Sequence, residues 1–199
     1  MLTRITLIVA KTILWFVVIS VALVVLLRFV PVTYTATMLM DENSVTRDWE
    51  PLSRIDRNMV SAVIAAEDSK FCSHDGFDVE AIEQALEERA EGKRERGAST
   101  ISQQTAKNVF LWQGGGFFRK GLEAYFTFLI ENLWSKRRIM EVYLNVAETG
   151  IGTYGVAAGA QRYFNRSAAR LTRDEASRIA AVLPSPKKRG AVNPTGWTA

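Results

Sequence analysis

The chain of 199 residues has very little of the two side chains that most often build metal sites and nucleophilic triads. It contains one cysteine, Cys72, and one histidine, His74. A single cysteine excludes an intramolecular disulfide, and a single histidine excludes a zinc site made of several histidines. It also leaves no histidine for a Ser-His-Asp triad elsewhere in the chain. Carboxylates are therefore the first place to look for acid-base chemistry.

The sequence also lacks internal repeats, long low-complexity tracts and nucleic-acid-binding motifs. Apolar residues make up 48% and charged residues 23%, which is typical of a folded protein rather than a disordered one. The formal net charge is +4, from 25 Lys and Arg against 21 Asp and Glu. This modest excess suits anionic lipid head groups or a phosphorylated lipid better than it suits nucleic acid. We expect a membrane lipid as a partner and no nucleic acid.

One long apolar run lies near the N-terminus. Residues 12–27 carry no charge and lie between Lys11 and Arg28. A helix of this length measures roughly 24 Å, and the flanking cations can snorkel to extend it toward the ~30 Å of a bilayer core. A cleaved signal peptide is the alternative, but no small-x-small cleavage pattern follows the run. We predict a single-pass anchor within residues 1–32, with Arg4 and Lys11 favouring a cytoplasmic N-terminus.

The anchor places the rest of the chain beside the cytoplasmic (inner) membrane, on its outer or periplasmic face. Residues 33–51 are expected to form an irregular connector with a short strand near residues 32–38, and residues 52–199 to form one domain, with no room for a second catalytic domain. Apolar spacing and capping residues predict an all-α domain with short loops, including a charged loop over residues 91–96. The expected helices cover residues 56–66, 79–89, 100–111, 118–134, 137–146, 156–164 and 172–184.

Two adjacent carboxylates, Glu67 and Asp68, end the first of these helices. At the edge of a core, desolvation can raise the pKa of a carboxylate that a substrate still reaches. Phe71, His74 and Gly76 follow at once. A lone histidine in a loop is more often a structural hydrogen-bonding group, and His74 is expected to brace Glu67 or Asp68.

Residues 97–108 form a flexible loop that continues into a helix N-terminus. Free backbone N–H groups, hydroxyls and the positive end of the helix dipole suit phosphate oxygens at such a position. Thr100 and Gln103 have the spacing of a capping box, so an ordinary capped helix with a solvated polar side is the alternative. That alternative explains the adjacent Gln103 and Gln104 and the following Lys107 less well.

Two basic clusters follow, each with a carboxylate at helical spacing. Arg119 and Lys120 precede Glu123, and a second cluster beginning at Lys136 precedes Glu141. Surface ion pairs are the common explanation of such patterns and contribute only ~0.3–0.5 kcal/mol each. The functional alternative is that the cations hold an anionic substrate.

Together, four motifs in this order resemble the family 51 peptidoglycan glycosyltransferases. They are Glu67-Asp-x-x-Phe71-x-x-His74-x-Gly76-x-Asp78, Gly97-x-Ser-Thr-Ile-x-Gln-Gln-x-x-Lys-Asn108, Arg119-Lys-x-x-Glu123 and Lys136-x-x-Ile139-x-Glu141-x-Tyr-Leu-Asn145. The resemblance covers roughly residues 54–184 and implies a lysozyme-like, two-lobed all-α fold in the monofunctional, membrane-anchored form. The tail, residues 187–199, is short and rich in Gly and Pro, whereas members of the family often continue with another helical segment.

The resemblance implies a role for each matching residue. Glu67 matches the general base and Glu123 the second catalytic carboxylate. Substrate-binding positions are implied at Asp68, Phe71 and His74, along the donor side at Ser99, Thr100, Gln103, Gln104, Lys107 and Asn108, at the diphosphate for Arg119 and Lys120, and in support of the cleft for Lys136 and Glu141. No protein-bound metal and no obligatory cofactor are implied, although a Mg or Mn ion can assist at the diphosphate.

The implied reaction transfers the growing undecaprenyl-diphosphate-linked glycan strand onto lipid II and forms a β-1,4 bond with inversion. A sugar hydroxyl needs a positioned base to attack at neutral pH, and a diphosphate leaves without a proton donor when cations stabilise its charge. Cell-wall synthesis or division proteins are the expected protein partners. Two alternatives remain: a lysozyme-like glycan hydrolase that uses the same glutamate, and an inactive membrane-anchored glycan-binding scaffold.

Overall fold

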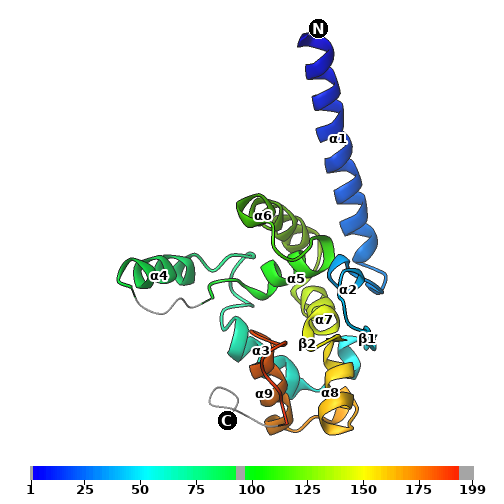
Figure 1. The fold of residues 1–199 in the computed structure, drawn as a ribbon, viewed down its shortest axis with the longest axis vertical. Helices are drawn as coiled ribbons and strands as arrows, with labels where there is room; N and C mark the ends of the chain where they lie inside the picture. The colour runs from blue at the N-terminus through cyan, green and yellow to red at the C-terminus, as the bar shows by residue number, and fades with distance from the viewer. Residues whose placement is uncertain (1, 93–96, 193–199) are drawn as a thin grey trace.

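The computed structural model describes residues 2–92 and 97–192, and helix predominates among them (Figure 1). Part of the predicted charged loop and the end of the tail lie outside these residues. The helices and strands are α1 (Leu2–Leu27), α2 (Ala36–Leu39), β1 (Thr46–Arg47), the 3-10 turn η1 (Leu52–Arg54), α3 (Arg57–Glu67), α4 (Val79–Ala90), α5 (Ile101–Phe110), α6 (Gly116–Leu133), α7 (Lys136–Val146), β2 (Glu148–Gly150), β3 (Thr153–Tyr154), α8 (Val156–Phe164), η2 (Ala168–Arg170) and α9 (Arg173–Val182). The helices predicted from spacing are all present, with bounds shifted by one or two residues.

Side chains at the N-termini explain where several helices begin. Asp78 caps α4 by accepting a hydrogen bond from a backbone N–H of its first turn. Thr100 with Gln103 and Thr172 with Glu175 form the two predicted capping boxes, at the starts of α5 and α9. Each pair satisfies backbone N–H groups that a helix leaves free in its first turn. The start of α5 carries one of the family motifs, so this cap also positions candidate site residues.

The prediction of a strand near residues 32–38 is wrong. The side chain of Thr35 accepts a hydrogen bond from the Met38 N–H at 3.2 Å and starts α2 there instead. Local capping by Thr35 outweighs the β preference of the residues around it. Strand β1 lies farther on, at Thr46–Arg47.

A small sheet, absent from the all-α prediction, joins the connector to the domain. Among the described residues its strand order is β1-β3-β2, with β1 parallel and β2 antiparallel to β3. Gly152 makes the tight turn before β3 with a φ of +64°, and a Cβ there would lie 2.6 Å from the Ser44 carbonyl oxygen. A glycine is therefore needed for the turn to approach β1. The register places Glu148 of β2 opposite Tyr154 of β3.

The described helices form two groups, in keeping with the predicted lysozyme-like, two-lobed fold. In one group α5 packs against both α6 and α7, and in the other α9 packs against α3 and α8. Ile130, Ile139 and Leu144 are fully buried in the first group, and Val63 and Ile179 in the second. Because Glu67 ends α3 and Gln104 lies on α5, the two groups meet at the predicted site.

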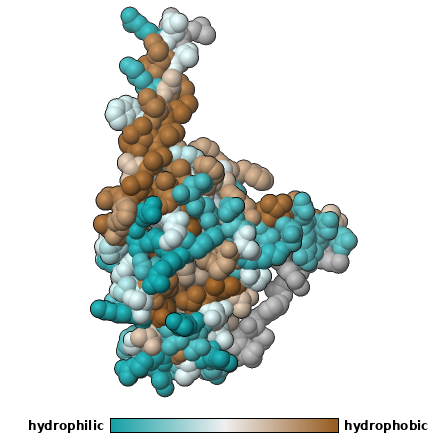
Figure 2. Space-filling model, turned by 180° about the vertical axis from the view of Figure 1, so that it is seen from behind, coloured by the Kyte–Doolittle hydropathy of each residue, from teal (hydrophilic) through white to brown (hydrophobic). Residues whose placement is uncertain are grey.

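Helix α1 extends away from the other helices, and apolar surface covers most of it (Figures 1 and 2). Residues 3–27 are long and apolar enough to cross a membrane, with a mean hydropathy of 2.6. The C-terminal half of α1 contacts α6 and α7. Ser20 Oγ and Tyr125 OH share a hydrogen bond of 2.6 Å, and the Trp134 indole donates to the Val24 carbonyl at 2.8 Å. Arg138 donates to the Leu27 carbonyl at 2.7 Å, so the end of the anchor is held by the domain.

Replacing Arg138 is expected to loosen this junction. Its guanidinium contacts carbonyls at the end of α1 and pairs with the partly buried Glu141. Arg138→Met should lower the free energy of unfolding by about 2 kcal/mol, the range for hydrogen bonds to charged groups, and the Tm by roughly 4–8 °C. Thermal unfolding of the detergent-solubilised chain measures this. Arg137→Met removes the same charge from an exposed neighbour, and an equal loss in both variants would contradict the account.

Candidate active site

Glu67, at the end of α3, is half-buried, and one oxygen of its carboxylate is unsatisfied. Its Oε2 accepts a hydrogen bond of 2.7 Å from the Gln104 side-chain amide. Its Oε1 is buried and has no hydrogen-bond partner within the described part of the chain. Burial raises the pKa of Glu67, while the Gln104 hydrogen bond and the positive charges of Arg189 and Lys107 lower it in part. A carboxylate with a raised pKa and a free oxygen is suited to accept a proton.

Tyr143 orients the amide that contacts Glu67. Its hydroxyl donates to Gln104 Oε1 at 3.2 Å, which leaves the amide N–H of Gln104 to donate to Glu67. Tyr143 is 1% exposed, and burial holds its pKa well above the usual range, so the hydroxyl keeps its proton. Sequence reasoning did not select Tyr143 as a site residue, although it lies within the fourth motif.

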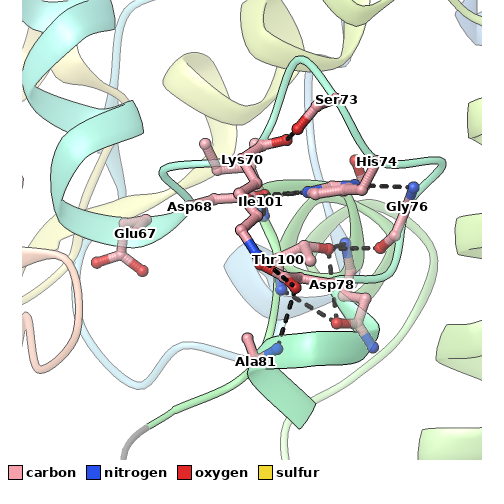
Figure 3. A network of polar contacts seen from close by, with 12 residues as sticks. Glu67, Asp68, Lys70, Ser73, His74, Gly76, Asp78, Ala81, Thr100 and Ile101 are labelled. Carbon is pink, nitrogen blue, oxygen red and sulfur yellow. Dashed lines mark hydrogen bonds and ion pairs between the residues drawn. The ribbon is translucent and has the colours of Figure 1, made fainter. Parts of the chain in front are cut away.

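Asp68 points away from Glu67, into the protein (Figure 3). Its carboxylate accepts a hydrogen bond of 2.9 Å from the Ile101 backbone N–H and lies 2.9 Å from His74 Nε2. The expectation that His74 braces one of the two carboxylates is confirmed for Asp68. Asp68 is only 7% exposed, so the structure uses it to join the end of α3 to the start of α5.

The loop after α3 is held on its other side by Lys136. The ammonium of Lys136 donates to the His74 carbonyl at 2.6 Å and to Glu131 Oε1 at 2.8 Å, and it lies 4.8 Å from the ring centroid of the buried Phe71. Thr100 Oγ1 donates to the Gly76 carbonyl at 2.7 Å. These contacts fix the loop between α5, α6 and α7.

Glu131 explains why glycine occupies position 76. Gly76 has a φ of +95°, and a Cβ there would lie 2.8 Å from Glu131 Cγ. Glu131 also accepts a short hydrogen bond from Ser102 and is the partner of Lys136. Sequence reasoning missed Glu131 because nothing marks one carboxylate on α6 as buried.

Glu123, on α6, is buried beneath two cations. Its side chain pairs with Arg119 at 2.6 Å and with Lys120 at the neighbouring oxygen, as the helical spacing predicts. Lys120 also donates to Ser99 Oγ at 3.3 Å. Glu123 is 2% exposed, whereas Lys120 is exposed, so the carboxylate holds cations whose other N–H groups remain available.

The charge of Lys107 interacts with both carboxylates, Glu67 and Glu123. Burial lowers its pKa, the charges of Glu123 and Glu67 raise it, and those of Arg119 and Lys120 lower it further. The half-buried ammonium of Lys107 therefore interacts electrostatically with both Glu67 and the Glu123 cluster.

A cavity of about 670 Å³ opens beside Lys107 and Gln104, the residues that contact or act on Glu67. Gln104, Lys107 and Asn108 of α5 line it together with Tyr143. Two other predicted positions contact the chain itself: Gln103 accepts from the Thr100 N–H within its capping box, and Glu141 accepts from the Leu52 N–H at 2.8 Å. The substrate roles assigned to the motif residues stay predictions.

The described residues do not build a metal cage. No group of three or more His, Cys, Asp or Glu side chains is placed to hold an ion within residues 2–92 and 97–192. Both oxygens of Glu123 contact cations, and Glu67 Oε1 is a single free oxygen. A divalent ion here would take most of its ligands from other sources.

A buried proton acceptor beside a cluster of cations, in a helical domain joined to an apolar helix, is the arrangement of an acid-base enzyme that acts on an anionic substrate. The sequence model of the family described as transglycosylase matches residues 34–197. The chain therefore belongs to the transglycosylase family.

Several relatives match this chain over most of their length. A protein of Caulobacter vibrioides is 50% identical, with 90% of this chain and 80% of the relative covered. A protein of Pseudomonas putida is 49% identical, with 96% and 84% covered, and one of Bdellovibrio bacteriovorus is 50% identical, with 95% and 79% covered. Each of these proteins is named biosynthetic peptidoglycan transglycosylase.

Replacing Glu67 by glutamine removes the candidate base and is also expected to stabilise the fold. Because burial raises the pKa of Glu67 above its ordinary value of 4.5, the wild type loses stability as the pH rises from that value through the raised pKa. Glu67→Gln should unfold at a higher temperature than wild type at pH 8, with the difference shrinking toward pH 4.

Thermal unfolding at a series of pH values measures this effect. Glu83→Gln, on the exposed face of α4, is the matched control and should show no such trend. A Glu67→Gln variant less stable than wild type at pH 8 would contradict the buried, disfavoured charge.

Proposed function

We propose that this chain polymerises the glycan strands of peptidoglycan at a membrane surface, using lipid II and the growing lipid-linked strand as substrates. The observation that carries the proposal is the half-buried Glu67, which has a free Oε1 and whose Oε2 is hydrogen-bonded to Gln104, a residue that lines the cavity with Lys107. Membership of the transglycosylase family and the names of the relatives support the same activity.

Glu67 is the base in this reaction. The 4-hydroxyl of the acceptor gives its proton to Glu67 Oε1 as its oxygen attacks the anomeric carbon of the donor strand. A base with a pKa nearer the working pH transfers protons more effectively, and burial moves the pKa of Glu67 in that direction. Attack from the face opposite the diphosphate inverts the α-linked donor to a β-1,4 bond.

The cations stabilise the departing undecaprenyl diphosphate. Arg119 and Lys120 are held by the buried Glu123, and the half-buried Lys107 faces the same cavity as Gln104. Preorganised cations in a partly desolvated site stabilise developing negative charge without a proton donor. Glu123 thus acts by fixing the cations, and a Mg or Mn ion would take its ligands largely from the diphosphate oxygens.

The apolar helix α1 places this site beside the lipid. We propose that α1 spans the cytoplasmic membrane once, with the N-terminus inside and the domain on the outer or periplasmic face, as Arg4 and Lys11 favour. Phe117 is 98% exposed and Phe118 is 73% exposed at the start of α6, which suits contact with the bilayer surface. Cell-wall synthesis or division proteins are the proposed protein partners.

The two alternative functions are less favoured. A glycan hydrolase has no use for the cluster of Lys107, Arg119 and Lys120, and an inactive scaffold gains nothing from an unsatisfied carboxylate oxygen. The names of the relatives describe biosynthesis rather than hydrolysis.

Labelled lipid II tests the proposal directly. The full chain in detergent should convert lipid II to polymer, and Glu67→Gln should lower the rate by a factor on the order of 10³, within the range for loss of a general base. Gel separation of the products measures this. Release of short fragments from finished glycan, without any polymer from lipid II, would instead support the hydrolase.

Glu123→Gln tests the role of the second carboxylate. The amide cannot pair with both Arg119 and Lys120, so we expect polymerisation to fall by a factor of about 10–100, the loss that follows removal of a charged hydrogen-bond partner. The same polymer assay measures it, with Glu83→Gln as the control. Full activity in Glu123→Gln would show that the cations need no such support.

A further inference from the structure

The cavity continues beyond the motif residues to an acidic end that the reaction described above does not use. Asp41, Glu148 and Tyr154 line it there, on the side formed by the connector and the small sheet. Thr37 lines the same cavity. None of these residues belongs to the four motifs.

Two polar atoms at this end lack partners. Glu148 Oε1 is buried without a hydrogen bond, and so is Thr37 Oγ1, whose residue is only 9% exposed, as judged over the described residues. Buried polar groups are nearly always satisfied, and leaving one unpaired costs stability. On this cavity the unpartnered Glu148 oxygen needs a hydrogen-bond donor, and the Thr37 hydroxyl can accept or donate, so the two atoms indicate a ligand with at least one donor.

The ionised Asp41 favours a cationic donor at this end, and a cation beside Glu148 offsets the burial that raises the pKa of Glu148. The Tyr154 hydroxyl donates to Asp41 Oδ2 at 2.5 Å and is the main cause that lowers the pKa of Asp41 to about 2, so Asp41 is ionised at neutral pH. The ammonium of Lys187 lies 3.9 Å from Asp41 and 4.0 Å from Glu148. These distances exceed hydrogen-bond length, so Lys187 leaves Glu148 Oε1 without a hydrogen bond. Asp41 is already engaged, with Oδ1 accepting from Asn43 and Oδ2 from Tyr154.

We propose that Glu148, with the negative charge of Asp41 on the same side of the cavity, forms a subsite for a primary ammonium group of the substrate. An ammonium has three N–H donors and matches carboxylate acceptors better than a metal ion does here, because the described residues offer no cluster of three metal-binding side chains. The inference rests on the proposed function: the peptide of lipid II carries such a group where it contains a diamino acid. The subsite would then hold the peptide while Gln104 and Glu67 face the sugar.

The inference is tested with two forms of lipid II, one with the diamino-acid amine free and one with that amine acetylated. For the unchanged protein, we expect acetylation to raise KM about tenfold and to leave kcat nearly constant, the loss of one charge-assisted hydrogen bond in binding. Equal KM values for the two substrates would overturn the subsite.

Glu148→Gln identifies the carboxylate responsible. It should raise KM about tenfold for the free amine and have little further effect on the acetylated substrate. Glu42→Gln removes the same charge from the exposed rim and should change neither KM by more than about twofold. An equal penalty on both substrates for Glu148→Gln would overturn the proposal, because it would show that Glu148 meets a neutral group or acts through the fold.

These results separate the inference from the function on which it depends. Polymer made equally well from both substrates would overturn the ammonium subsite and leave the polymerase function intact. Absence of polymer with both substrates would overturn the ammonium subsite and the polymerase function together. The comparison of two substrates on the unchanged protein needs no variant, so a folding defect in Glu148→Gln leaves the inference open to refutation.

Discussion

The site depends on one buried carboxylate that binds no substrate in this account. Asp68 accepts hydrogen bonds from the first N–H of α5 and from His74, and so joins the end of α3, the following loop and the start of α5. The positive end of the α5 dipole and the free N–H groups there favour a negative charge at this position. With Asp68 directed inward, the neighbouring Glu67 is directed toward Gln104 and the cavity.

Unpaired polar groups at the site cost stability, and paired groups around the site contribute stability. Glu67 keeps an unsatisfied buried oxygen, and Glu148 and Thr37 do the same at the far end of the cavity. Around them, both oxygens of Glu123 and of Asp68 contact donors, and Glu131 Oε1 contacts Ser102 and Lys136. These paired carboxylates hold the scaffold, whereas the unpaired oxygens of Glu67 and Glu148 lie in residues at the site, which is the pattern expected where function competes with stability.

Much of this could be predicted from the sequence because its signals are local. Capping residues and apolar spacing located the helices, and the helical interval placed Arg119 and Lys120 against Glu123. The small sheet could not be predicted, because its strands are two or three residues long and pair Thr46 with Thr153 across the chain. The Tyr143–Gln104–Glu67 contacts, the burial of Glu131 and the pairing of Asp41 with Tyr154 likewise join residues distant in sequence.

The central claim is that Glu67 takes the proton of the acceptor hydroxyl. Burial raises the pKa of Glu67, and the hydrogen bond from Gln104 lowers it in part. The pH dependence of kcat/KM for lipid II polymerisation tests this most directly. The rate should fall on the acid side as Glu67 becomes protonated, and Gln104→Leu, which removes the hydrogen bond that lowers this pKa, should move that fall to higher pH. An acid limb at the same pH in wild type and Gln104→Leu would contradict the account.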